Sequence, residues 1–431
     1  MKQFYLLTLL ATLAFTGCKK DDASRPRNLT VKQTEYTLDA VEKRTATVSF
    51  TAPANWTLSV VYDDAESSAD WLTVTPASGT AGKQAVELLA TSNLQATSRT
   101  AYADLVCGKQ SVRLTVTQTA VSDDTDFTAL FDEAFAQELQ RQGIIADADN
   151  ITPEDMEKIA AITSLDVSGS YENPGTLTSL RGIEYFESLT YLYCYYNQLT
   201  SLDVSRNTAL TKLDCNNNSL TTLDVSNCTA LTKLDCYGNQ LTSLDVSRNT
   251  ALTELYCDRN QLPSLDVSRN TELTDLWCYS NQLTSLDVSR NTALKTLLCY
   301  YNQLTSLDVS QNTALTLLYC FNNSLTTLDV SRNTELTDLY CYYNQLTSLD
   351  VSRNTALKTL QCYYNQLTSL DVSRNTALTE LRCEYNPGDG VSSFPITAWF
   401  DNDTKPGNLE IDQEQWTYGD KTITLDFRKA E

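Results

Sequence analysis

Histidine is absent from all 431 residues of the chain. Its absence excludes a Ser-His-Asp or Cys-His catalytic pair, an imidazole zinc site and proton shuttling by a histidine. Basic residues are few: 32 lysines and arginines stand against 54 aspartates and glutamates, for a formal net charge of -22. Because nucleic-acid affinity depends on basic side chains that contact phosphates, this balance argues against a nucleic-acid partner. The 42% apolar fraction allows two or three folded domains.

Long apolar runs are missing beyond the N-terminus. There, Lys2 precedes the run YLLTLLATLAF, which is too short for a membrane helix and ends at Thr16-Gly17-Cys18. This layout is typical of a secretory signal, and residues 15–18 resemble the lipobox of Gram-negative lipoproteins. The charged residues 19–22 resemble the surface-export signal of some outer-membrane lipoproteins. The resemblance implies a signal peptide over 1–17 and a lipid on Cys18 as the only membrane anchor. It places the chain on the outer membrane, facing the cell exterior, with simple secretion as the alternative.

Residues 29–120, after a linker over 18–28, alternate apolar and polar residues in short runs separated by turn signals, which predicts a small β-sandwich. The run Ala69-Asp70-Trp71-Leu72-Thr73-Val74-Thr75-Pro76, with the Ser78-Gly79-Thr80-Ala81-Gly82 stretch, resembles the BACON domain. BACON domains commonly precede other modules in surface proteins, and a glycan-binding role has been proposed for them. Trp56 and Trp71 could serve as sugar platforms, but tryptophan in a strand pattern is more often core. We therefore interpret the domain as a spacer.

The segment over residues 127–185, after a polar linker over 121–126, predicts a helical N-terminal cap and a first divergent repeat. Apolar residues keep helical spacing from Phe127 to Leu139, and a second helix starts at Thr152-Pro153. Such a cap covers the exposed apolar edge of a repeat array. Residues 387–431 predict a C-terminal cap of short strands.

A unit close to LTSLDVSRNTALTKLxCxxNQ recurs with a period of 21 over residues 186–386, giving ten repeats. Each repeat has a leucine two residues before a cysteine and an asparagine three residues after it. This is the leucine-rich-repeat signature, and it resembles most closely the cysteine-ladder repeats of internalin-type surface proteins. The predicted fold class is mainly β: a β-sandwich followed by a leucine-rich-repeat solenoid with a parallel sheet. The cysteines that mark the period are Cys194, Cys215, Cys236, Cys257, Cys278, Cys299, Cys320, Cys341, Cys362 and Cys383.

The fixed positions of the repeat have structural explanations. The cysteines of neighbouring coils have parallel Cβ directions, which favours buried free thiols over disulfides or a metal site. Each asparagine can bond the backbone where the chain leaves the strand. A ladder of outward aspartates from Asp203 to Asp371 needs compensation, either from an arginine three residues on or from backbone N–H groups. Calcium bridging is the remaining alternative for this ladder. We expect no metal and no cofactor.

The positions beside each cysteine vary between copies and point to the solvent face of the predicted sheet. Aromatic residues gather there, and we interpret them as a binding strip for an extended ligand. The alternative is that the rings stack on their copies and only rigidify the sheet. The predicted binding residues are Tyr256, Trp277, Tyr279, Tyr300, Tyr301, Tyr319, Phe321, Tyr340, Tyr342, Tyr343, Tyr363 and Tyr364.

The best enzymatic candidate is the pair Asp214 and Asp235, which share one register on adjacent coils. Their separation could approach that of a retaining glycosidase pair. Lysines flank both, no pocket is predicted around them, and we interpret them as a solvated charged face. The predicted function is therefore non-enzymatic: a monomeric surface adhesion protein that recognises a protein ligand through the strip. Glycan capture for a carbohydrate-uptake system and a purely structural envelope role are the alternatives.

Overall fold

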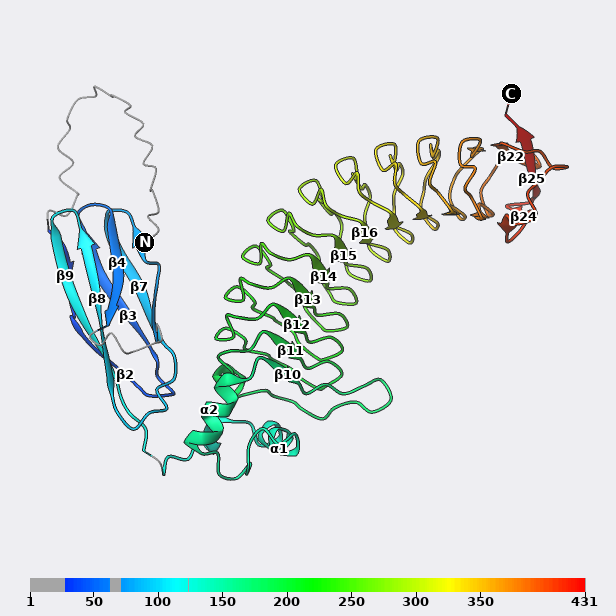
Figure 1. Cartoon of the computed structure of the whole chain (residues 1–431). Coiled ribbons are helices and arrows are strands. Elements are labelled where there is room, and N and C mark those ends of the chain that lie inside the picture. Colours follow the sequence, from blue (N-terminus) through cyan, green and yellow to red (C-terminus); the bar gives the residue numbers. More distant parts are fainter. Residues whose placement is uncertain (1–27, 63–70, 123, 431) are drawn as a thin grey trace, which may run out of the picture. The chain divides into compact units, whose positions relative to one another are not determined.

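The computed structural model describes residues 28–62, 71–122 and 124–430 (Figure 1). The chain divides into two compact units, Met1–Asp123 and Asp124–Glu431. The predicted signal peptide and the lipidation site Cys18 lie outside the described residues. Within the described ranges, no helix combines the length and the apolar character needed to cross a bilayer.

The first unit is a β-sandwich, as predicted. One sheet has the order β1 (Thr30–Val31), β3 (Thr45–Ala52), β7 (Gly82–Ala90), β5 (Leu72–Thr75). The other has the order β2 (Glu35–Leu38), β9 (Gln110–Gln118), β8 (Arg99–Cys107), β4 (Trp56–Tyr62), β6 (Ser78–Gly79).

The two tryptophans of the sandwich belong to its core. Trp56 and Trp71 are 2% and 3% exposed. Trp56 packs edge-on against Phe50, with ring centroids 4.9 Å apart, and the Arg99 guanidinium covers Trp71 at 4.6 Å. Their faces are therefore unavailable as sugar platforms, which confirms their interpretation as core residues.

Helices open the second unit and close the first end of its repeat array. They are η1 (Thr128–Leu130), α1 (Glu133–Arg141), α2 (Pro153–Ala161) and η2 (Ile183–Tyr185). Thr152 caps α2, because its hydroxyl accepts the Asp155 N–H while the Asp155 carboxylate accepts the Thr152 N–H. Phe135 is fully buried and packs on Phe186, with ring centroids 6.0 Å apart. The first coil is thus covered by apolar side chains of the cap.

The repeats form a curved solenoid whose strands line the concave side (Figure 1). Each coil contributes one short strand to a long parallel sheet. Each residue of a strand pairs with the residue 21 positions further on in the next strand, such as Leu276 with Leu297. A strand of the N-terminal segment and one of the C-terminal segment extend the sheet to twelve strands. Their order is β10 (Ser164–Asp166), β11 (Tyr191–Tyr193), β12 (Lys212–Asp214), β13 (Lys233–Asp235), β14 (Glu254–Tyr256), β15 (Asp275–Trp277), β16 (Thr296–Leu298), β17 (Leu317–Tyr319), β18 (Asp338–Tyr340), β19 (Thr359–Gln361), β21 (Glu380–Arg382) and β23 (Glu410–Ile411).

The cysteine ladder lies in the core of the solenoid. From Cys194 to Cys383 the ladder cysteines are 0–1% exposed, and every cysteine of the described ranges has a free thiol. Burial raises the pKa of the Cys320 thiol to about 12. The thiols therefore stay protonated and pack as small apolar side chains.

Asparagines satisfy the backbone at the turns of the coil, as the repeat pattern predicts. The asparagine that follows each cysteine by three residues bonds two coils at once: Asn260 Nδ2 donates to the carbonyls of Cys236 and Cys257, at 3.0 and 3.1 Å. Its Oδ1 accepts the Leu241 N–H at 2.9 Å. A second asparagine ladder donates to carbonyls of the preceding coil, as Asn249 Nδ2 does to Val225 and Cys228.

Cys228 occupies the position of the second asparagine ladder in its own coil. Its thiol donates to the Val204 carbonyl at 3.4 Å and reaches the Asn207 carbonyl at 3.7 Å. These are the equivalents of the two carbonyls that Asn249 reaches in the next coil, so the thiol acts as a weaker substitute donor.

Replacement of Cys228 by asparagine is expected to stabilise the solenoid. The amide would exchange one weak S–H contact for two N–H donors in a position where Asn207 and Asn249 already fit, for a gain of about 1 kcal/mol. Urea denaturation of parent and variant measures the change. A loss of stability of the same size would contradict the substitute role of the thiol.

The aspartate ladder is compensated by the backbone. In each of nine coils the Asp Oδ1 accepts the N–H of the serine two residues on, at 2.9 Å. Hydrogen bonds from Ser310 hold the pKa of the Asp308 carboxyl below its ordinary value. Among the described residues these aspartates form no ion pair with the arginines three residues on, and no group of acidic or cysteine side chains is arranged to hold a metal ion.

A small sheet closes the far end of the solenoid. Its order is β20 (Leu370–Asp371), β22 (Ser393–Ala398), β25 (Lys421–Lys429), β24 (Gln415–Tyr418). Phe394 and Trp416 are buried, and the Trp416 indole N–H donates to the Asn386 carbonyl at 3.0 Å. The cap is thereby joined to the last asparagine of the first ladder.

Candidate functional site

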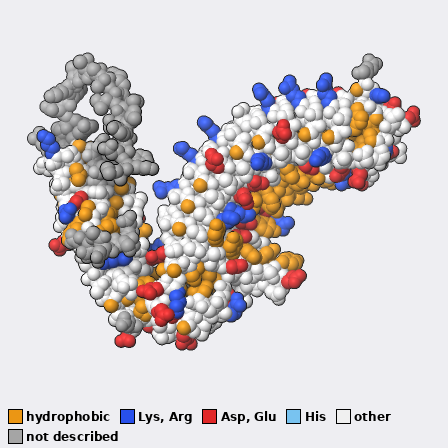
Figure 2. Space-filling model, in the orientation of Figure 1, with side chains coloured by type: hydrophobic (Ala, Val, Ile, Leu, Met, Phe, Trp, Pro, Cys, Tyr) orange, Lys and Arg blue, Asp and Glu red, His pale blue; other side chains and the backbone are white. Residues whose placement is uncertain are grey.

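Aromatic side chains occupy three parallel columns on the strand side of the solenoid, which together we call the aromatic face. The front column holds the residue before each cysteine, the middle column the residue after it, and the turn column the next residue along. Figure 2 shows a band of hydrophobic side chains along the concave side of the solenoid, whereas lysines and arginines project from the convex edge. The three columns contain all twelve predicted binding residues.

The middle column contains an uninterrupted stack of five rings. Successive centroids lie 4.2–4.3 Å apart with interplanar angles of 9–13°. The stack consists of Tyr279, Tyr300, Phe321, Tyr342 and Tyr363. Stacking at this distance rigidifies the sheet and leaves ring edges, not ring faces, toward the solvent.

Phe321 is the member of this stack whose environment differs from the prediction. It was expected on the solvent face, and its register does point outward from the strand. However, Phe321 is only 8% exposed, because Tyr300 and Tyr342 cover its two faces at 4.2 Å each. Tyr301 packs edge-on against it as well. The side chain therefore stabilises the aromatic face from within and is not available for direct contact with a ligand.

The front column is also partly covered by its own members. Tyr256 and Trp277 lie 4.4 Å apart, and Tyr319 and Tyr340 lie 4.1 Å apart, with tilted rings. Leu298 separates the two pairs and is 9% exposed. These side chains form a half-buried apolar floor.

The turn column carries the most exposed rings of the aromatic face. Tyr301, Tyr343 and Tyr364 are 54%, 45% and 37% exposed. Their backbones are left-handed, with φ of 49–50°, because the chain reverses direction directly after the strand. Tyr343 stacks on Tyr364 at 4.4 Å and Tyr364 on Tyr385 at 4.2 Å. This column is the part of the aromatic face best placed for direct contact with a ligand.

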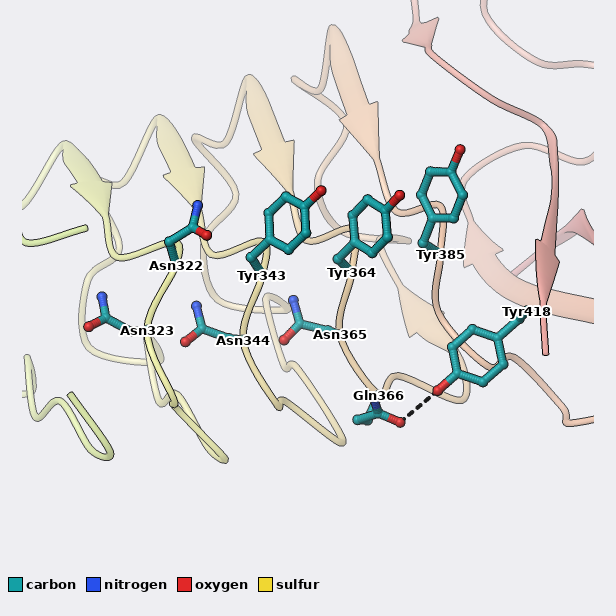
Figure 3. Close-up of a pocket in the computed structure, with 9 residues that line it drawn as sticks. All are labelled: Asn322, Asn323, Tyr343, Asn344, Tyr364, Asn365, Gln366, Tyr385 and Tyr418. Atoms are coloured by element: carbon teal, nitrogen blue, oxygen red, sulfur yellow. Dashed lines mark hydrogen bonds between the residues drawn. The ribbon is translucent and has the colours of Figure 1, made fainter. Parts of the chain in front are cut away.

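A hollow of about 380 Å³ lies beside the last rings of the turn column. Figure 3 shows the rings of Tyr343, Tyr364 and Tyr385 in a row along it, above a row of asparagine amides. Tyr418 of β24 stands opposite, and its hydroxyl donates to Gln366 Oε1 at 2.9 Å (Figure 3). Sequence reasoning missed Tyr418, since only the folding of the C-terminal cap brings it beside the repeats.

Buried acids flank the five-ring stack of the middle column on both sides. Asp258 and Glu384 are each 1% exposed, next to Tyr279 and Tyr363 in the same column. Burial raises the pKa of the Asp258 carboxyl to about 6 and also raises the pKa of Glu384. Arg382 lies 3.3 Å from Glu384 and over the face of Tyr363, so this end of the column also carries a cation.

Asp214 and Asp235 are paired across adjacent strands as the register predicts, but they are only partly exposed to solvent. Both are half-buried. Burial, followed by the charge of Asp214, raises the pKa of Asp235 to about 7, and burial raises the pKa of Asp214. The two carboxyls are therefore less solvated than the interpretation as a solvated charged face requires, because neighbouring coils bury part of each side chain.

These carboxyls make stability depend on pH. The folded pKa of Asp235 is about 7, whereas an unfolded aspartate titrates near about 3.9. Because the folded pKa is raised, stability from this group is fully present below the unfolded pKa and is lost as pH rises toward about 7. Asp235→Asn is therefore expected to raise the free energy of unfolding at about pH 8 by roughly 1 to 3 kcal/mol, and much less at about pH 5.

Urea denaturation of Asp235→Asn and the parent at both pH values measures this effect. Asp287→Asn is the matched control, since Asp287 is exposed and hydrogen bonds from Ser289 hold its pKa below the ordinary value. A gain for Asp235→Asn that is equal at both pH values would show that its carboxyl is not the titrating group.

Two segments of the chain match known families. Residues 28–121 match the viral BACON domain, and residues 187–228 and 208–249 match leucine-rich repeats. The array is a leucine-rich-repeat solenoid. The same 21-residue unit continues in register to residue 386. The resemblance stated from the sequence is confirmed for both domains. No curated protein matches the chain significantly.

Solved leucine-rich-repeat structures are similar to this chain. The functional domain of InlJ from Listeria monocytogenes, which includes a cysteine ladder, is 28% identical over 70% of this chain and 98% of its own, with a TM-score of 0.44. An internalin, inlF, from Listeria monocytogenes is 23% identical over 61% of this chain and 92% of its own, with a TM-score of 0.42. A leucine-rich-repeat protein of Leptospira interrogans is 23% identical over 61% of this chain and 74% of its own, with a TM-score of 0.48.

The two families also bear on the class of function. Leucine-rich repeats and BACON domains are typically binding folds without catalytic residues, and repeat arrays present extended surfaces to protein partners. In this leucine-rich-repeat solenoid the aromatic face runs along the strands of the parallel sheet. Its exposed members come from variable positions of the repeat, whereas the leucine, cysteine and asparagine ladders build the support behind them.

Proposed function

We propose that the protein is a monomeric, non-enzymatic adhesion or recognition protein of the cell surface. In this proposal a lipid on Cys18 anchors the chain to the outer membrane, the BACON domain acts as a spacer, and the leucine-rich repeats bind an extended protein ligand. The observation that carries the proposal is the turn column, where Tyr301, Tyr343 and Tyr364 remain substantially exposed on a rigid, stacked support. Tyrosine gives large contact area at a low cost in conformational entropy, which suits a protein interface.

The physical chemistry of the face favours a protein over a small metabolite. Its rings are spread over several coils, whereas a metabolite site encloses its ligand in one deep pocket. Glycan capture is the second candidate, supported by the BACON match over residues 28–121. Since Trp56 and Trp71 are core residues, a glycan would have to use the aromatic face of the repeats instead.

Site-specific photocrosslinking on intact cells tests the proposed interface. A benzophenone amino acid at position 343 is expected to give a discrete protein adduct. The same amino acid at position 311 is the control, because Gln311 is exposed on the Leu-Asp-Val-Ser side of its coil, outside the sheet. Equal adduct formation at the two positions, or glycan-array binding without any protein adduct, would contradict a protein ligand on the aromatic face.

Labelling with a lipid precursor and protease shaving of intact cells test the anchor. The parent is expected to carry lipid and to be cleaved from outside. Cys18→Ser is expected to lose the lipid and to be released from the membrane fraction. Retention of the variant in the outer membrane would contradict anchoring through Cys18.

A further inference from the structure

The turn column has a gap between two of its exposed rings. Tyr301 and Tyr343 lie two coils apart, and the coil between them places Asn322 at the same position. Asn322 has the same left-handed backbone as its neighbours, with φ of 51° against 50° and 49°. The repeat geometry is therefore continuous through the gap, and only the ring of the middle coil is missing.

The two flanking rings keep equivalent orientations. Tyr301 meets Tyr300 and Phe321 edge-on, with centroids 5.7 Å away and interplanar angles of 65° and 78°. Tyr343 meets the next pair of the middle column, Tyr342 and Tyr363, at 5.8 Å with angles of 69° and 73°. Because the backbone and the ring packing repeat, Tyr301 and Tyr343 present parallel faces to each other across Asn322.

The width of the gap matches one planar ring. Where the turn column is filled, successive rings lie 4.2–4.4 Å apart with interplanar angles of 7–8°. The rings of Tyr301 and Tyr343 are consequently separated by about twice this centroid spacing. The space between them is wide enough for one additional stacked ring. The exposed fraction of each ring rises as stacked neighbours in the turn column are lost. Tyr364 has a ring on both sides and is 37% exposed, whereas Tyr343 has a ring on one side and is 45% exposed. Tyr301 has no ring on either side in this column and is 54% exposed.

The remaining sides of the gap are also defined. Phe321 and Tyr342 of the middle column stack at 4.2 Å and form its back wall, against which an inserted ring would pack edge-on. Asn322 forms its base and is only half-buried. The backbone N–H of Asn322 donates to the Tyr342 carbonyl at 3.1 Å. Its side-chain amide has no hydrogen-bond partner in the described part of the chain, so it can accept from, or donate to, a polar group on the inserted ring. The hollow described above begins at this residue (Figure 3).

We propose that the gap is a binding slot for one aromatic side chain of the protein ligand, sandwiched between Tyr301 and Tyr343 above Asn322. The inference rests on the proposed function and names the chemistry of its central contact. An indole or phenol ring would complete the stack of the turn column with a ring neighbour on both faces and an edge contact behind. A sugar ring would find a single free amide for its several hydroxyls, so the slot favours an aromatic ring over a pyranose.

Asn322→Tyr tests the slot directly, since a tyrosine at this backbone conformation already fits at positions 301 and 343. The new ring is expected to fill the slot and to raise the melting temperature of the solenoid. Binding of N-acetyl-tryptophanamide, measured by saturation-transfer NMR, is expected to weaken by about tenfold, the effect of losing a stacking contact on each face. Asn217→Tyr is the control, because Asn217 has the same register and a φ of 49° in a coil without the slot, and it should leave indole binding unchanged.

Unchanged indole binding in Asn322→Tyr, or a lower melting temperature for this variant, would overturn the slot. Binding of methyl β-glucopyranoside that is equally sensitive to Asn322→Tyr would also overturn it, because the slot would then take a sugar ring. These outcomes are separate from failure of the proposed function, which would appear as the absence of a protein adduct from position 343 in the parent background.

Discussion

Replacement of Asn260 by alanine is expected to lower the free energy of unfolding of the solenoid by about 3 to 5 kcal/mol, among the largest effects of any single polar substitution. Asn260 is 8% exposed and makes four hydrogen bonds. Its loss would leave the buried Leu241 N–H without a partner. The carbonyls of Cys236 and Cys257 would each lose one of two donors and keep only Asn239 and Asn281.

Urea denaturation followed by circular dichroism measures this loss. Asn227→Ala is the matched control, because Asn227 is exposed and makes one hydrogen bond, to the Ser205 carbonyl at 3.1 Å. The control should change stability by less than about 1 kcal/mol. If Asn260→Ala cost no more than the control, the asparagine ladder would not be what holds the coils in register.

Phe321→Ala is expected to cost about 3 to 5 kcal/mol, the range for removing a buried phenylalanine. The substitution opens a cavity in the middle of the five-ring stack, where Tyr300 and Tyr342 each lose a stacking partner at 4.2 Å. Tyr301→Ala removes a ring that is 54% exposed and should cost only about 1 kcal/mol.

The comparison of the two alanine variants distinguishes a ring that stabilises the aromatic face, Phe321, from a ring that is available to contact a ligand, Tyr301. If Tyr301→Ala destabilised the solenoid as much as Phe321→Ala, the turn column would be part of the support. That result would favour the alternative, in which the rings of the aromatic face only stiffen the sheet and bind no ligand. Denaturation curves of both variants, with ligand binding measured on each, decide between the two readings.

The repeat itself could be predicted from the sequence because its signal is geometric. A 21-residue period without slips fixes which residues stack, so Leu276 had to lie against Leu297, and Cys278 had to face the core. The caps were predictable for a similar reason. Thr152-Pro153 starts a helix by local chemistry alone, and an array needs its end covered.

Exposure within the aromatic face could not be predicted from the same register. Register shows that Phe321 points away from the strand, but whether it meets solvent depends on the rings of the adjacent coils. For Asp235, likewise, the sequence shows a polar side chain on the outer face. Its raised pKa arises from packing between coils, which no periodicity records.

The gap at Asn322 lies between these two cases. Aligning the copies of the repeat shows that tyrosines at positions 301 and 343 flank an asparagine, so the signal was present in the sequence. Its meaning required the left-handed backbone and the 4.2–4.4 Å spacing of the filled part of the column. The centroid spacing of the filled part of the column defines the width of the slot that the missing ring leaves.

The central claim is that the exposed rings of the turn column bind a protein ligand. The most direct test begins with purification of the ligand protein that crosslinks to position 343. Its affinity is then measured for the parent chain and for a variant in which Tyr301, Tyr343 and Tyr364 are all changed to serine. Tyr171→Ser is the control, because Tyr171 is 83% exposed and lies outside the aromatic face. We predict at least about 100-fold weaker binding by the triple variant, which should remain folded with a melting temperature lowered by only several degrees. The control should bind as the parent does. Parent-like affinity in a folded triple variant would contradict the claim.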